Sequence, residues 1–163
     1  MDRLIIMRHG TAERRGPSGG DFDRPLTAQG RAEALAVAHA LAEAGVKPDF
    51  AVVSSATRAS QTWEEAARVF GDVDAAFDKA MYSAHPRGVL DLAQAHRGCV
   101  MVVGHNPTLH DLAVGLLHEG GAPRALAAKV EMKFPPATAV AFSFDAEGLP
   151  VFDGLFYAAE AMA

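Results

Sequence analysis

Three short apolar runs constrain the fold most, because each ends at a polar or glycine-containing junction and each is followed by a helical pattern. They are residues 4–7, 50–53 and 99–103. Runs of this length suit strands that are buried on both faces, as the strands of a parallel sheet are. Because strands that alternate with helices form parallel crossover units, the pattern predicts an α/β fold with a mainly parallel sheet.

Helix and turn signals supply the remaining elements. The expected helices run from Thr27 to Gly45, from about 57 to 70, from Pro86 to a point before Gly98, and onward from Pro107. A weak strand is expected near 73–77. Two β-prone runs, 138–144 and 151–157, flank a turn and predict a C-terminal antiparallel edge pair. No repeat or linker interrupts the chain, so residues 1–163 are expected to form one domain.

Composition excludes several classes of protein. The chain has 163 residues, half of them hydrophobic, and a formal net charge of −5. This balance argues against extensive disorder, and the lack of a basic excess argues against nucleic-acid binding. A single cysteine, Cys99, excludes an intrachain disulfide framework and a cysteine-rich zinc site, and it fits a reducing compartment. Neither a targeting signal nor a membrane span is visible, so we expect a cytoplasmic protein with no membrane partner.

The three strand-to-helix junctions collect cationic and polar side chains. They are Arg8–Thr11 (RHGT), Ser54–Arg58 (SSATR) and Gly104–Pro107 (GHNP). In an open α/β sheet such junctions share the carboxyl edge, where these folds bind ligands. Two arginines and two histidines at one edge indicate an oxyanion site, most simply for phosphate. Residues 1–31 also carry six arginines against four acids, a basic opening that hints at an anionic ligand.

Two features of the helix starts strengthen this interpretation. Arg58 lies in the first turn of its expected helix, where a cation is unfavourable unless an anion neutralises it. Asn106 is expected to cap a helix that begins at Pro107, which would aim free backbone N–H groups toward His105.

Four motifs in order resemble the histidine phosphatase superfamily, whose fold is the phosphoglycerate mutase-like fold. The stretch 7–10 (MRHG) is similar to its RHG signature, and 25–30 (PLTAQG), 54–62 (SSATRASQT) and 103–107 (VGHNP) are similar to its later motifs. The short length and residues 80–84 (AMYSA) make the chain most like the bacterial SixA-type phosphohistidine phosphatases. The resemblance implies a three-layer α/β/α sandwich with a mainly parallel sheet.

The resemblance also implies roles for individual residues. His9 would attack phosphorus and form a covalent phosphohistidine, which requires a neutral imidazole. Arg8, Arg58 and His105 would stabilise the phosphoryl oxygens. The substrate-binding residues would be Gly10, Thr11, Ser55 and Asn106. Neither a metal nor another cofactor is expected, because these side chains supply the positive charge.

One departure from the wider superfamily bears on the substrate. Phosphomonoesterase members generally place an acidic residue after the second helix to protonate the leaving oxygen, but this chain has no carboxylate between Asp78 and Pro86. A general acid contributes typically about 10²–10⁴-fold. Imidazole leaves more easily, so the departure favours a phosphohistidine substrate. Four residues remain candidate proton donors: Glu13, Asp21, Asp23 and His85.

Three hypotheses follow from the sequence. The first is a metal-independent phosphatase acting on phosphohistidine in a protein, such as a histidine phosphotransfer domain of a signalling relay. The second is a phosphomonoesterase acting on a small substrate such as a sugar phosphate, nucleotide or cofactor precursor. The third is a non-catalytic module that binds a phosphoprotein.

His105, His110 and Asp111 could suggest a metal cluster, but five residues along a helix turn the His105 and His110 rings about 140° apart. The sequence leaves the oligomeric state open.

Overall fold

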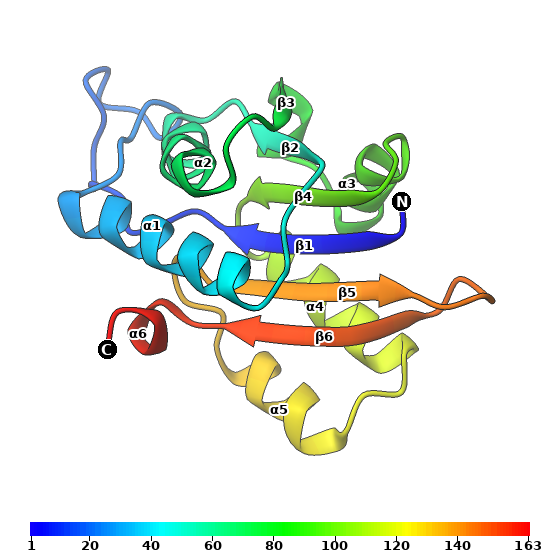
Figure 1. The fold of residues 1–163 in the computed structure, drawn as a ribbon. Helices are drawn as coiled ribbons and strands as arrows, with labels where there is room; N and C mark the ends of the chain where they lie inside the picture. The colour runs from blue at the N-terminus through cyan, green and yellow to red at the C-terminus, as the bar shows by residue number, and fades with distance from the viewer.

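The short apolar runs form the centre of one six-stranded sheet in the computed structural model, which describes residues 1–163. The strands are β1 (Arg3–Arg8), β2 (Phe50–Ser54), β3 (Asp74–Asp78), β4 (Cys99–Gly104), β5 (Ala139–Phe144) and β6 (Pro150–Phe156). Their order is β3-β2-β4-β1-β5-β6 (Figure 1). The pairs β2–β3, β2–β4 and β1–β4 are parallel, whereas β5 runs antiparallel to β1 and β6 antiparallel to β5. Both the parallel centre and the C-terminal antiparallel edge pair are confirmed.

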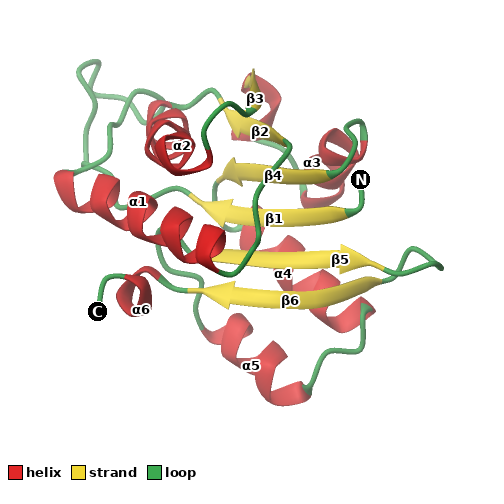
Figure 2. Ribbon diagram, in the orientation of Figure 1, coloured by secondary structure: helices red, strands yellow, loops and turns green.

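Helices cover both faces of the sheet, so the predicted three-layer arrangement is confirmed (Figure 2). One face carries α1 (Ala28–Glu43), α2 (Thr57–Phe70) and the short α6 (Ala158–Ala161). The other carries α3 (Pro86–Gln94), α4 (Thr108–Glu119) and α5 (Arg124–Met132). A 3₁₀ turn, η1 (Lys79–Tyr82), joins β3 to α3. No helix is both long enough and apolar enough to cross a membrane.

Strand β1 shows why the first apolar run has no polar face. Ile5 and Met7 point into the core under α1 and α2, while Leu4 and Ile6 point into the core under α4. All four side chains are fully buried. An alternating apolar and polar pattern would have left one of these two cores unfilled, so continuous hydrophobicity at the sheet centre follows directly from the two helical layers.

Two features of the chain differ from expectation. Helix α5 was not expected, although Leu126, Val130 and Phe134 follow one another at helical spacing and pack in the core beneath α4. The expectation that Asn106 caps a helix beginning at Pro107 is wrong. Helix α4 begins at Thr108 and has no side-chain cap, and the Asn106 amide donates instead to the carbonyl of Phe134 over 3.0 Å.

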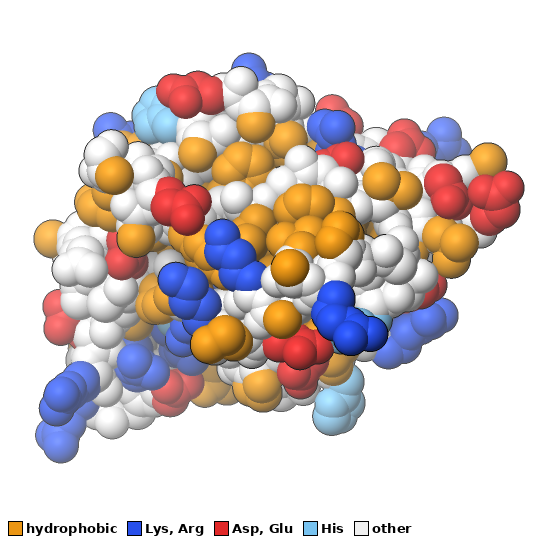
Figure 3. All heavy atoms as spheres, turned by 90° about the horizontal axis from the view of Figure 1, so that it is seen from below, with side chains coloured by type: hydrophobic (Ala, Val, Ile, Leu, Met, Phe, Trp, Pro, Cys, Tyr) orange, Lys and Arg blue, Asp and Glu red, His pale blue; other side chains and the backbone are white.

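The edge strand β6 is protected against pairing with another chain. It begins with Pro150, a register irregularity interrupts its pairing with β5 at Ala141/Phe142, and Asp153 binds Arg3 across the sheet at 3.2 Å. Prolines, irregularities and charges are features by which natural edge strands avoid intermolecular pairing. The surface on this side also mixes apolar side chains with lysine, arginine and acidic groups (Figure 3).

The loop after β1 packs unusually close to the start of α1. A Cβ atom on Gly10 would lie 2.4 Å from the carbonyl oxygen of Gly30, and one on Gly30 would lie 2.0 Å from that of Thr11. Both distances are shorter than any Cβ contact tolerates, so only glycine allows the two backbones to meet. This contact fixes the loop that carries His9 against the first turn of α1.

Replacing Gly30 by alanine is therefore expected to destabilise the protein by about 3 kcal/mol, since the backbone must move to admit the methyl group. Gly115→Ala is the matched control. Gly115 is exposed in α4 with nothing within 4 Å of its Cβ position, so alanine there should stabilise the protein by about 0.5–1 kcal/mol. Urea unfolding of the two variants measures both effects. Equal effects at the two positions would contradict the packing argument.

Candidate active site

The three polar junctions meet at the carboxyl ends of β1, β2 and β4. Arg8 pairs with Gly104 in the sheet register, and the His9 N–H donates to the Gly104 carbonyl over 3.0 Å. Ser54 ends β2, beside β4, and Arg58 follows in the first turn of α2. The predicted convergence of the junctions is thus present in the fold.

His9 is a buried, neutral imidazole with one ring nitrogen fixed as a donor. Its Nδ1 lies 2.7 Å from the Gly10 carbonyl, which can only accept, so the proton is on Nδ1. Its Nε2 therefore keeps a lone pair, which accepts a hydrogen bond from Arg58 Nε over 3.3 Å. Burial lowers the pKa of His9, the Gly10 hydrogen bond raises it, and the neighbouring His105, Arg58 and Arg8 lower it, with a net value of about 3.

Arg58 is almost fully buried and is held by the loop between β1 and α1. Its Nη1 donates to the backbone carbonyl of Asp21 over 2.8 Å, and its Nη2 forms an ion pair with the Asp21 carboxylate at 2.9 Å. The anion expected near this cation is therefore supplied, at least in part, by the chain itself. The Tyr82 hydroxyl, together with Arg24 and Arg58, holds the pKa of the Asp21 carboxyl well below its usual range.

Arg8 lies beneath the same site. Its Nη1 donates to the Phe134 carbonyl over 2.9 Å, the same oxygen that accepts the Asn106 amide. Burial lowers the pKa of Arg8, and the nearby positive charge of Arg58 lowers it further, partly offset by Glu33. Two guanidinium groups that repel each other in this way gain most from an anion placed between them.

His105 stands across the site from His9, with ring centroids 5.4 Å apart. Its Nε2 lies 2.8 Å from the Ser54 hydroxyl. Burial, Arg58 and Arg8 lower the pKa of His105 and Asp21 raises it, with a net value of about 4. Both histidines are thus uncharged at neutral pH, and the arginines carry the positive charge of the site.

Every buried side-chain polar atom without a hydrogen-bond partner belongs to a residue in or next to these junctions. The four atoms are Arg8 Nε, His105 Nδ1, Asn106 Oδ1 and Thr138 Oγ1. An unpaired buried polar group costs about 1–3 kcal/mol, and native proteins tolerate few of them. Their concentration here indicates a site built to bind a ligand that supplies the missing partners.

The four residues expected to bind substrate have different surroundings. The Gly10 carbonyl orients His9, and its N–H donates to Thr62 Oγ1 over 3.0 Å. Thr11 is already engaged, because its N–H and its hydroxyl donate to Glu33 over 2.8 and 3.1 Å. The half-buried Ser55 hydroxyl makes no hydrogen bond, and the Asn106 amide is bound to Phe134 as described. The substrate-binding roles of these residues stay predictions.

Sequence reasoning missed three groups that orient the site. Glu33, 7% exposed, fixes the loop after His9 through Thr11. The buried Ser54 hydroxyl contacts His105, although its neighbour Ser55 was the predicted residue. The third group is the backbone carbonyl of Phe134, which the sequence could not reveal because every residue type has such a carbonyl. The only signal for Glu33 in the sequence was an acidic residue one turn before Val37, which is buried in α1.

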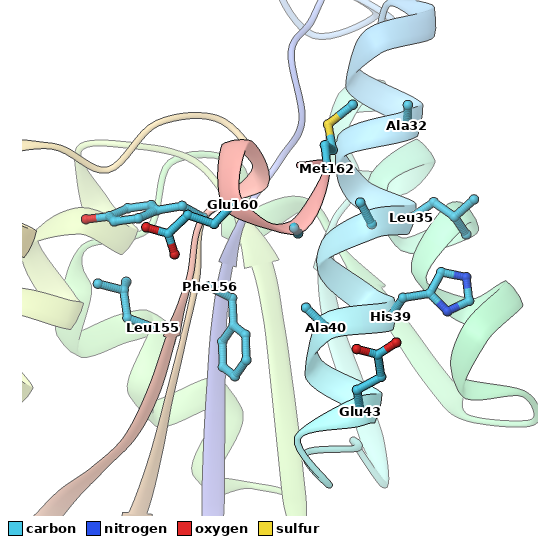
Figure 4. A pocket seen from close by; sticks show the side chains of 12 residues that line it. Ala32, Leu35, His39, Ala40, Glu43, Leu155, Phe156, Glu160 and Met162 are labelled. Atoms are coloured by element: carbon cyan, nitrogen blue, oxygen red, sulfur yellow. The ribbon is translucent and has the colours of Figure 1, made fainter.

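The largest of the three cavities described lies elsewhere. It measures about 680 Å³ and lies between α1 and the segment 155–162 (Figure 4). Two smaller cavities, of about 260 and 320 Å³, lie beside α4 and α5. None of these three is lined by His9, Arg58 or His105. No group of three or more His, Cys, Asp or Glu side chains is placed to hold a metal ion.

Comparison with known proteins identifies the family. Residues 4–82 match the model of the histidine phosphatase superfamily (branch 1). The uncharacterized protein Rv1276c of Mycobacterium tuberculosis is 34% identical over 133 residues, which cover 79% of this chain and 81% of that protein. The chain belongs to the histidine phosphatase superfamily.

Two solved structures are similar to this histidine phosphatase over nearly the whole chain. SixA from Agrobacterium tumefaciens is 29% identical with a TM-score of 0.82, over 94% of this chain and 96% of that one. A protein histidine phosphatase SixA complexed with tungstate has a TM-score of 0.73 and 23% identity, over 97% and 98% of the two chains. The chain is a phosphatase with a SixA-like fold, as the motifs predicted.

No protonated carboxyl group reaches His9 in this phosphatase. Of the four candidate donors, only Asp21 contacts a residue of the site, and its carboxyl is held ionised. Asp23 accepts from Ser18 at the exposed end of its loop. Glu13 and His85 are exposed and make no side-chain hydrogen bond.

The low pKa of His9 makes stability fall in acid. The unfolded histidine takes up a proton as pH drops through about 6.5, whereas the folded one stays neutral down to about 3. Because the unfolded state then binds more protons, His9 should cost the folded state about 2 kcal/mol between pH 7 and pH 5. Urea unfolding at both pH values should show a decline that is about 2 kcal/mol smaller in His9→Gln. An equal decline in both proteins would contradict a neutral buried His9.

Proposed function

We propose that the protein hydrolyses phosphohistidine on a protein substrate, through a phosphorylated His9, without a metal ion. The proposal rests on two observations made together: His9 is neutral with its lone pair on Nε2, and the site offers no protonated carboxyl group. The nucleophile needs no base to activate it. The leaving group must depart without an acid.

In the first step, His9 Nε2 attacks phosphorus opposite the leaving nitrogen of the substrate. The P–N bond to the substrate breaks, and a P–N bond to His9 forms. If the other ring nitrogen of the substrate carries a proton, the substrate leaves as neutral imidazole and His9 becomes the protonated phosphohistidine. No proton has to move, because Nδ1–H of His9 is already in place against Gly10.

Water then attacks phosphorus and displaces His9 Nε2. The oxygen and both protons of the water end on phosphate, and His9 returns to its neutral form. Arg58 and Arg8 stabilise the charge on the phosphoryl oxygens in both steps, aided by the unpartnered Nδ1 of His105 as a third donor.

Leaving-group chemistry favours imidazole over an alcohol. Neutral imidazole is the conjugate base of a group whose pKa is about 6.5, so it departs without assistance at neutral pH. An alkoxide is a far stronger base and gains about 10²–10⁴-fold from a general acid. Transfer between two histidines also exchanges one P–N bond for another, so the first step is nearly balanced in energy.

The proposed partner is a phosphohistidine-bearing protein such as a histidine phosphotransfer domain, which places the enzyme in signal transduction. None of the three cavities described is lined by His9, so the proposal does not rest on an enclosed pocket for a small substrate. The proposal includes a cytoplasmic location, since the unpaired, buried Cys99 suits a reducing compartment.

The proposal is tested by comparing kcat/KM on a phosphohistidine protein with kcat/KM on sugar phosphates, nucleotides and phosphorylated cofactor precursors. His9→Ala serves as the background control. We expect the phosphohistidine substrate to be preferred by at least about 10²-fold, the lower contribution of a general acid. Faster turnover of a small phosphate ester would overturn the proposal in favour of a phosphomonoesterase. Tight binding without turnover would favour a phosphoprotein-binding module.

A further inference from the structure

Two aromatic rings stand at the entrance to the site and take no part in the two phosphoryl-transfer steps described above. Phe22 comes from the loop before α1, and Tyr82 is the last residue of η1. Their ring centroids are 5.0 Å apart in an edge-to-face contact. Tyr82 in turn meets the His105 ring edge-to-face at 5.5 Å. A row of four rings therefore leads from the surface inward: Phe22, Tyr82, His105 and His9.

The outer two rings are fixed to the same groups that hold Arg58. The Tyr82 hydroxyl donates to the Asp21 carboxylate, which also binds Arg58. The next residue, Phe22, is anchored through its carbonyl, which accepts the Thr57 N–H over 3.1 Å. The Arg58 guanidinium carbon lies 5.9 Å from the Tyr82 ring centroid. The rings thus keep a defined position relative to the cation expected to hold the phosphoryl group.

Phe22 remains 37% exposed despite this anchoring. A rigid, partly exposed aromatic group beside a cationic site is placed to bind part of a substrate. The leaving group of an in-line transfer lies opposite His9, and therefore on the entrance side of phosphorus. Aromatic faces attract both other aromatic rings and cations. Phe22 already receives one cation in this way, the Lys79 ammonium at 5.9 Å from its ring centroid.

We propose that Phe22 and Tyr82 form an aromatic shelf that binds the imidazole ring of the phosphohistidine substrate and selects it over aliphatic leaving groups. The inference rests on the proposed function and names two specificity-determining residues for it. Protonated phosphohistidine presents a ring that is both aromatic and cationic. The shelf therefore favours the protonated form of the substrate phosphohistidine, from which neutral imidazole departs without an acid.

The test compares two peptides that share the P–N bond but differ in leaving group, one carrying phosphohistidine and the other phospholysine. Phe22→Leu keeps an apolar side chain but removes the ring. We expect it to lower kcat/KM on the phosphohistidine peptide about tenfold and to change kcat/KM on the phospholysine peptide less than twofold. Phe22→Tyr, which keeps the ring, should keep the wild-type preference. Tyr82→Phe keeps the ring and removes only the hydroxyl that binds Asp21, so it should also keep the preference.

The matched control is Phe144→Leu, which removes a half-buried ring at the opposite edge of the sheet, beside Asp2. It should leave both kcat/KM values unchanged. Equal losses on both peptides, or no loss in Phe22→Leu, would overturn the shelf while leaving the proposed function intact. A wild-type enzyme that turns over sugar phosphates faster than either peptide would overturn the proposed function, and the shelf with it.

Discussion

Replacing His9 by alanine should lower kcat on any phosphorylated substrate by at least about 10⁴-fold, since the nucleophile of a covalent mechanism is lost. The size of the effect follows from the geometry of His9. Its Nδ1–H is bound by Gly10, so Nε2 is the only nitrogen free to attack phosphorus. His105 offers no second nucleophile in this account, because its Nε2 is bound to Ser54 and its Nδ1 carries the proton that is donated to the phosphoryl group. Steady-state assays of released phosphate measure the loss.

His39→Ala is the matched control for this result. His39 is an exposed histidine of α1 that lines the cavity away from the site (Figure 4). It should retain full activity. If His9→Ala kept more than about one hundredth of the wild-type kcat, the covalent route through His9 would be wrong.

Replacing Arg58 by alanine should lower kcat/KM by about 10³-fold, within the range that single charge-stabilising groups contribute to phosphoryl transfer. Arg58 is the only side chain that contacts both His9 Nε2 and the entrance loop, through Asp21. Arg58→Lys should recover only part of the loss, because an ammonium group lacks the planar fork that matches phosphoryl oxygens. The kcat and KM of both variants on one substrate give the measurement.

Arg68→Ala tests whether the loss is specific to the site. Arg68 lies on the same helix, is mostly exposed and binds only Glu65, at 3.0 Å. Its removal should change kcat/KM less than twofold. Similar losses in Arg58→Ala and Arg68→Ala would point to destabilisation of α2 rather than loss of charge stabilisation.

The convergence of His9, Arg58 and His105 could be predicted from the sequence, because the ends of buried strands are easy to recognise there. Buried strands are continuous apolar runs, and polar residues that follow them fall at one edge of a parallel sheet. The same logic located β1, β2 and β4 without any contact information. The resemblance to the family rested on these same junctions, so both arguments reached the same site.

The groups that hold these residues in place could not be predicted from the sequence, because they are largely backbone atoms. The Phe134 carbonyl orients Arg8 and Asn106 alike, and any residue there would supply it. Asn106 was expected to cap α4, yet this acceptor binds its amide and the helix starts one residue later than predicted. Asp21 was a candidate acid by residue type alone. Only the structure shows, through the hydrogen bond from Tyr82 and the ion pairs with Arg24 and Arg58, that it is held as a carboxylate.

The central claim, transfer of a phosphoryl group from phosphohistidine to His9, is tested most directly by trapping the intermediate. A protein substrate carrying ³²P-phosphohistidine is mixed with excess enzyme and quenched within milliseconds in alkaline detergent, which preserves P–N bonds. The account predicts label on the wild-type enzyme, located at His9 and decaying as phosphate appears, and no label on His9→Ala. Release of labelled phosphate by the wild type with no label ever found on the enzyme would contradict it.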